Sequence, residues 1–152
     1  MIFKMDIKTS NQINDLRIYL GLNISQIANI FKVKRVTIYS WINGKNPSRY
    51  NQKKLNKLYY FCKIWRSYGI NRGLDNCFYQ YYGCDKSLID LLSEDNLNEE
   101  LIIQIFSKIK DIYLQRKKEE INHEKFLRKH NFKEIPFEKI KRCLNLYIPT
   151  IS

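Results

Sequence analysis

The chain has 152 residues, of which 44% are hydrophobic and 14% aromatic, so it can bury a core and is too apolar to be a disordered tail. No window approaches the roughly 18 uncharged apolar residues of a membrane span, and the start MIFKMDIKTS has no apolar segment of signal-peptide length. We therefore expect an intracellular, cytoplasmic protein with no membrane partner, whose four cysteines are reduced.

Positive charge is concentrated in the first part of the chain. Residues 1–68 hold 13 Lys or Arg against 2 Asp, whereas residues 69–152 hold 14 Lys or Arg against 13 Asp or Glu. Between residues 69 and 107 the balance is 2 basic against 7 acidic side chains, which DNA would repel. The asymmetry predicts a nucleic-acid-binding domain over 1–68 and a region with another task over 69–152, although a solvated basic surface would have the same composition.

Two short helices are predicted first. Apolar residues at helical spacing indicate a helix over residues 11–20, which Gly21 ends. Asn23 can cap the N-terminus of a second helix. The apolar positions of this second helix are Ile24, Ile27, Ala28 and Phe31.

A third and a fourth helix follow. The third has Val33, Ile38 and Trp41 as its core positions, with Val33 in the preceding turn. Gly44 can adopt a positive φ and Pro47 cannot continue a helix, so the third helix ends before them. The fourth helix, over residues 50–68, has its core positions at Leu55, Leu58, Phe61, Cys62 and Trp65.

The second and third helices have the pattern of a helix-turn-helix, in which the second helix of the pair enters the major groove of DNA. Small Ala28 allows the two helices to approach closely, while Ile38 and Trp41 hold the recognition helix on the core. Basic residues near both ends of that helix can meet phosphates. The residues left to face outward are Arg35, Val36, Tyr39 and Ser40.

This part of the chain resembles a known family. The stretch LNISQIANIFKVKRVTIYSWINGKNPS is similar to the Xre-type helix-turn-helix of phage repressors and Cro-like proteins. The resemblance covers about residues 11–65 and implies an all-α N-terminal bundle that binds double-stranded DNA. The positions that match the family pattern are Leu22, Asn23, Ile27, Ala28, Val33, Thr37, Ile38, Trp41, Gly44, Lys45 and Pro47.

The resemblance also implies roles for single residues. Arg35, Val36 and Ser40 lie where such proteins address base edges, with Thr37 and Tyr39 nearby. Arg35 is the foremost candidate, because a guanidinium can bond guanine O6 and N7 together, which is worth on the order of 1 to 3 kcal/mol of discrimination. Tyr39 has a second interpretation as a packing residue.

Residues beside the recognition helix are expected to meet phosphate. Asn43 and Lys45 match the family's phosphate-contacting turn. Two residues depart from the family pattern: Ile24 replaces a polar phosphate ligand, and Lys34 stands where a Ser or Thr cap is usual. Lys34 then leaves the helix without a side-chain cap but adds a cation that can hold phosphate. The basic residues of the fourth helix, which either contact the DNA backbone or form a solvated face, are Arg49, Lys53, Lys54 and Lys57.

The C-terminal region resembles no family that we recognise, and its pattern is helical. A short helix is expected near residues 88–92, a break at 93–96, and a helix over 101–113 that is apolar on more than one stripe. Such breadth predicts burial between neighbours, within the chain or across a partner. A charged segment follows, and Pro136 begins a last amphipathic run.

No catalytic or metal-binding pattern stands out. His123 and His130 lack the spacing of two zinc ligands on a helix, and Cys77 and Cys84 lack paired CxxC spacing. We therefore expect no enzyme, no cofactor and no metal.

Two functions fit these observations. The first is a sequence-specific transcriptional regulator, a homodimeric repressor that dimerises through its C-terminal helices and is nucleoid-associated when bound to DNA. The second is an antitoxin or anti-defence protein whose C-terminal region binds a partner protein and whose helix-turn-helix autoregulates its operon. A C-terminal ligand sensor and binding to RNA or single strands are weaker alternatives.

Overall fold

The computed structural model describes residues 7–70 and 72–130. Regular structure in this part of the chain is helical, apart from one isolated antiparallel bridge between Tyr81 and Ser87. The all-α fold class predicted from the sequence is confirmed. The structure divides into two compact units, Met1–Lys110 and Asp111–Ser152.

The first helix ends at a glycine, as the sequence predicts. Helix α1, Thr9–Asp15, continues as a π-helical turn, η1, over Leu16–Leu20. Gly21 follows with a φ of 79°, and its backbone N–H donates to the carbonyl of Leu16. This left-handed conformation is accessible to glycine at little cost, so the chain turns sharply here.

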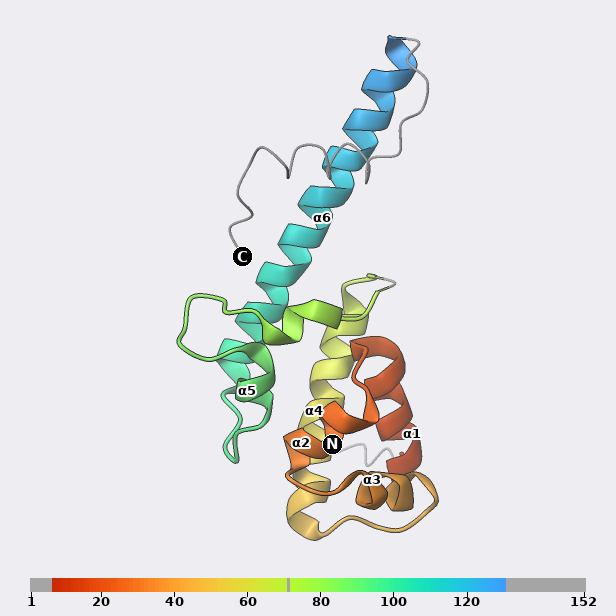
Figure 1. Cartoon of the computed structure of the whole chain (residues 1–152), viewed down its shortest axis with the longest axis vertical. Coiled ribbons are helices and arrows are strands. Elements are labelled where there is room, and N and C mark those ends of the chain that lie inside the picture. The colour runs from red at the N-terminus through yellow and green to blue at the C-terminus, as the bar shows by residue number, and fades with distance from the viewer. Residues whose placement is uncertain (1–6, 71, 131–152) are drawn as a thin grey trace, which may run out of the picture. The chain divides into compact units, whose positions relative to one another are not determined.

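Helix α4, Arg49–Ser67, begins at Ser48, whose hydroxyl accepts from the backbone N–H of Asn51. It runs beside α1 and η1 in the same direction (Figure 1). Its predicted core positions are all buried, which confirms the helical pattern. Side-chain pairs that join α4 to α1 and η1 along their length include Thr9–Gln52, Gln12–Asn56 and Tyr19–Arg66.

Helices α2, Ile24–Phe31, and α3, Arg35–Ile42, lie between α1 and α4 in sequence. Asn23 caps α2: its side chain accepts from the Gln26 backbone N–H at 2.8 Å, and the Gln26 side chain accepts from the Asn23 N–H at 2.9 Å. This reciprocal box satisfies two N–H groups that would otherwise lack partners. The predicted N-cap is confirmed.

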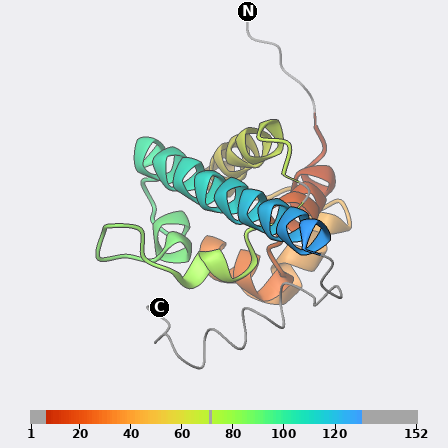
Figure 2. The ribbon, with the colours of Figure 1, turned by 90° about the horizontal axis from the view of Figure 1, so that it is seen from above.

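The core of the first unit includes residues that come before and after Tyr68 in the sequence, where the predicted boundary between the two domains lies. The elements that follow are a 3-10 turn η2, Asp75–Tyr79, and helices α5, Leu88–Leu92, and α6, Glu99–Lys129. Phe106 of α6 is fully buried, with its ring centroid 6.2 Å from that of Phe61 and 5.7 Å from that of Trp65. The end of α4 therefore lies beside the first turns of α6 (Figures 1 and 2).

The division into domains 1–68 and 69–152 stays a prediction. In the residues that the structure describes, the compact units are instead divided after Lys110, and one hydrophobic cluster extends from Ile13 to Ile109. The apolar stripes expected over residues 101–113 are largely inside this cluster, within the chain.

The second unit contains the last part of α6. The helix continues to Lys129 through the charged segment. None of the described helices is long and apolar enough to cross a membrane. The amphipathic run predicted from Pro136 lies outside the described residues. Large apolar side chains that this part of α6 exposes are Ile112, Leu114, Ile121 and Phe126.

Cys62 is expected to resist alkylation in the folded protein. Its thiol is fully buried and donates to the carbonyl of Asp15. Burial is the main cause that raises its pKa from 9.0 to about 12; Asp15 also raises this pKa, and Arg66 opposes the shift. Because the thiolate is the reactive form, iodoacetamide at pH 8 should modify Cys77 and Cys84, which are partly exposed, long before Cys62. Mass spectrometry of the cysteine peptides would measure this order, and equal rates would contradict the packing of α4 on α1.

Candidate nucleic-acid interface

Helix α3 is fixed to the core by one side. Ile38 is fully buried and Trp41 is only 3% exposed. The Trp41 ring meets Phe31 of α2 edge to face, with centroids 5.4 Å apart. Trp41 is thus a core residue, which confirms the prediction that it holds α3 on the core.

The connection between α2 and α3 is a turn over residues 32–34. Lys32 adopts a left-handed conformation with a φ of 55°, and the N–H of Val33 donates to the carbonyl of Ala28 at 3.0 Å. Val33 is half-buried and lies in the turn, as predicted. Lys34 occupies the N-cap position of α3 without a side-chain cap. An ammonium group has no acceptor for the first N–H groups of α3, so Lys34 adds a cation there but no cap, as predicted.

The other side of α3 faces solvent. Val36 is 75% exposed. Tyr39 and Asn43 follow at helical spacing and are also exposed. Ser40 is half-buried beside them, and its hydroxyl donates to the carbonyl of Thr37 at 2.7 Å, which leaves its oxygen to accept.

The predicted site residues occupy α3 and its two flanks. Most are exposed: Lys34, Arg35, Val36, Tyr39, Asn43, Lys45 and Arg49. Thr37 and Ser40 are half-buried. Gly44 has a φ of 106° and open space around it, so the turn with Asn43 and Lys45 projects into solvent. The result is an exposed helix face with cationic side chains before it, at its first residue and after it.

The interpretation of Lys54 as part of an exposed face is wrong. Lys54 is only 6% exposed, and its ammonium donates to the carbonyls of Ile30 and Glu94 at 2.8 and 3.1 Å. Burial lowers the pKa of this lysine. The side chain joins the end of α2 to the chain after α5 and cannot reach a DNA backbone. Lys53 and Lys57 of the same helix are exposed.

Sequence reasoning missed a polar cluster beside the α2–α3 turn. Asp95 accepts hydrogen bonds from the Lys32 ammonium at 3.1 Å and the Tyr50 hydroxyl at 3.0 Å. These bonds lower the pKa of Asp95, and the bond to Asp95 raises the pKa of Tyr50. The partners are 45 or more residues apart, so no local pattern could have indicated the contact. The only signal was the acidic composition of residues 69–107.

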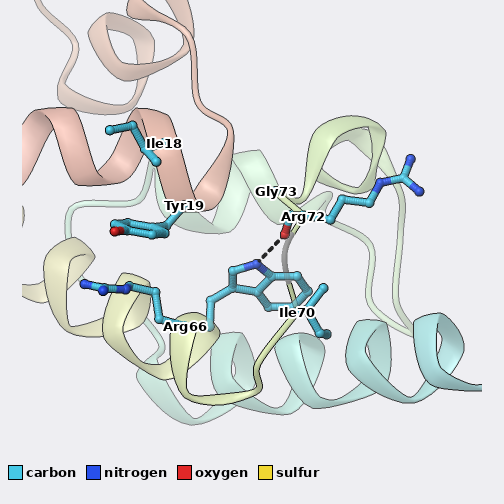
Figure 3. Close-up of a pocket in the computed structure, with 7 residues that line it drawn as sticks. Ile18, Tyr19, Arg66, Ile70, Arg72 and Gly73 are labelled. Atoms are coloured by element: carbon cyan, nitrogen blue, oxygen red, sulfur yellow. Dashed lines mark hydrogen bonds between the residues drawn. The ribbon is translucent and has the colours of Figure 1, made fainter.

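A cleft of about 260 Å³ lies between the ends of η1 and α4 (Figure 3). The Arg66 guanidinium carbon is 3.9 Å from the centroid of the Tyr19 ring, and the Trp65 indole N–H donates to the carbonyl of Arg72 at 2.9 Å. The lining has no carboxylate, thiol or imidazole, and its ionisable side chains are Tyr19, Arg66 and Arg72. The lining residues are Ile18, Tyr19, Trp65, Arg66, Ile70, Arg72 and Gly73.

Metal-binding clusters are absent from residues 7–70 and 72–130: no three His, Cys, Asp or Glu side chains gather in a way that could hold an ion. Comparisons with family models, with curated proteins and with solved structures find no match to this chain.

Proposed function

We propose that the chain is a sequence-specific, double-stranded DNA-binding transcriptional regulator, a homodimeric repressor that inserts α3 into the major groove. The observation that carries the proposal is the two-sided character of α3. One side is held in the core by Ile38 and Trp41, and the other presents Arg35, Val36 and Tyr39 to solvent. A rigidly mounted, exposed helix next to cations is what readout of base edges requires.

Charge supports the same proposal. Lys34 precedes α3, Lys45 follows it and Arg49 begins α4, so cations lie beside the exposed face on both flanks. Cations at these positions can meet phosphates and fix the register, while Arg35 reads a base. Residues 1–68 hold only 2 acidic side chains to oppose them.

Replacement of Arg35 by alanine tests the role of α3. The Arg35→Ala variant should lose about 5- to 150-fold in affinity for a duplex selected by the wild-type protein, which corresponds to the 1 to 3 kcal/mol of a bidentate contact with guanine. Its affinity for a scrambled duplex should fall much less. Fluorescence anisotropy with the two labelled duplexes at one salt concentration measures both affinities.

The matched control is Arg17→Ala, which removes an exposed arginine of η1. It has the same change in net charge but should preserve the preference for the selected duplex. Equal losses in the two variants would show that Arg35 acts only through charge, and the assignment of α3 to base readout would fail.

The exposed apolar side chains of the second unit favour a protein partner for this region. Ile112 and Phe126 share one face of α6 by the helical period, and Leu114 and Ile121 share another; all four are about half exposed. An apolar face of this kind can meet a second copy of the chain or another protein. The alternative function, an antitoxin or anti-defence protein that autoregulates its operon, uses the same surface for its target. In that case Arg35→Ala should weaken binding to the selected duplex as above, while a co-purifying partner stays bound.

A further inference from the structure

The loop between α5 and α6, residues 93–98, lies beside the end of α2 and the α2–α3 turn. Lys54 holds it from inside, because its buried ammonium bonds to the carbonyls of both Ile30 and Glu94. From outside, Lys57 of α4 pairs with Glu99 at 3.7 Å. These contacts determine where the next residue, Asp95, must lie.

Asp95 accepts hydrogen bonds from two side-chain donors that lie next to the proposed recognition helix. Lys32 belongs to the turn that leads into α3, and Tyr50 belongs to the first turn of α4, just after the loop that leaves α3. Both donate to the same Asp95 oxygen, and all three side chains are largely exposed. An exposed ion pair of this kind contributes little to the stability of the fold. A stabilising role therefore does not explain why Asp95 is placed here.

Lysine ammonium and tyrosine hydroxyl groups are among the side-chain donors that proteins use to contact DNA phosphate. An aspartate that holds them has the charge and the acceptor oxygens of a phosphate group. We propose that Asp95 competes with DNA phosphate for Lys32 and Tyr50, and so reduces the sequence-independent part of the affinity for DNA. Asp95 is then a specificity-determining residue that acts from outside the DNA-binding helices, a role that rests on the proposed function.

The consequence is a shift in what determines binding. Phosphate contacts supply affinity for any sequence, and base contacts supply discrimination. When Lys32 and Tyr50 are bonded to Asp95, the protein makes fewer phosphate contacts with DNA of any sequence. Base contacts from α3 then supply a larger share of the total binding free energy. One acidic residue of the region 69–107, Asp95, would thereby limit how strongly the basic domain binds DNA of any sequence.

The test is the Asp95→Asn variant, which keeps the shape of the side chain and removes its charge. Titration of a labelled random-sequence duplex at several salt concentrations should give a gain of about fivefold in affinity at about 0.15 M salt. The slope of log affinity against log salt should steepen by about 0.9, because one more phosphate is neutralised.

Two further variants separate competition from net charge. Asp85→Asn removes an exposed carboxylate from the same acidic region and should give a clearly smaller gain. In a Lys32→Gln background, Asp95→Asn should lose most of its effect, because only the uncharged Tyr50 hydroxyl is then released. Equal gains from Asp85→Asn and Asp95→Asn, or no gain from Asp95→Asn, would overturn the inference. If the wild-type protein bound no duplex at any salt concentration, the proposed function itself would fail.

Discussion

Replacement of Phe106 by alanine should lower the free energy of unfolding by about 3 to 5 kcal/mol, the usual cost of removing a buried aromatic ring. Phe106 is fully buried between Phe61 and Trp65 of α4. The loss should extend beyond α6, because the cavity lies against the helix that runs beside α1. Urea denaturation followed by circular dichroism measures the size of the loss.

Hydrogen exchange would show which helices lose stability in the Phe106→Ala variant. Peptides from α4 should exchange faster in Phe106→Ala, together with peptides from the first turns of α6. The control is Ile112→Ala on the same helix, where the side chain is 46% exposed and the expected change is within about 0.5 kcal/mol. Faster exchange confined to α6 would show that α6 is not part of the core of the N-terminal helices.

The second large effect is expected at Trp41. The Trp41→Ala variant should lose about 3 to 5 kcal/mol of stability, because it empties the space between α3 and Phe31 of α2. Trp41→Phe retains an edge-to-face partner for Phe31 and should lose markedly less. Thermal and urea unfolding of the two variants measure this difference.

Val36→Ala is the matched control for Trp41. It lies on the same helix at 75% exposure, so its stability should stay within about 0.5 kcal/mol of the wild type, whereas its affinity for a selected duplex should fall. Stability and binding are thus assigned to opposite sides of α3. A stability loss at Val36 as large as that at Trp41 would contradict this assignment.

Local sequence patterns predicted the N-terminal helices well, because each depends on neighbours a few residues apart. Gly21 ends the first helix as expected, Gly44 adopts the positive φ expected of it, and Asn23 forms its cap. The burial of Ile38 and Trp41 beside an exposed Val36 follows from the helical period. The position of the candidate site on α3 therefore follows from the amino-acid sequence alone.

Contacts between distant segments could not be predicted in this way. Lys54 has the pattern of one more basic residue on an amphipathic helix, and its burial depends on Glu94, 40 residues later. The contact of Asp95 with Lys32 joins residues 63 apart. Phe106 was expected to be buried, but nothing local identified α4 as its neighbour. A helical period gives the buried side of an element and leaves open which element covers it.

The most direct test of DNA recognition by α3 is selection of duplexes from a randomised library with the full-length protein, followed by titration of the selected and scrambled duplexes at several salt concentrations. We predict an inverted motif whose half-sites are about 34 Å apart, as two copies of α3 in a dimer require, and an affinity that falls steeply as salt rises. Recovery of no preferred sequence, or an affinity that salt does not change, would contradict the proposal that α3 reads double-stranded DNA.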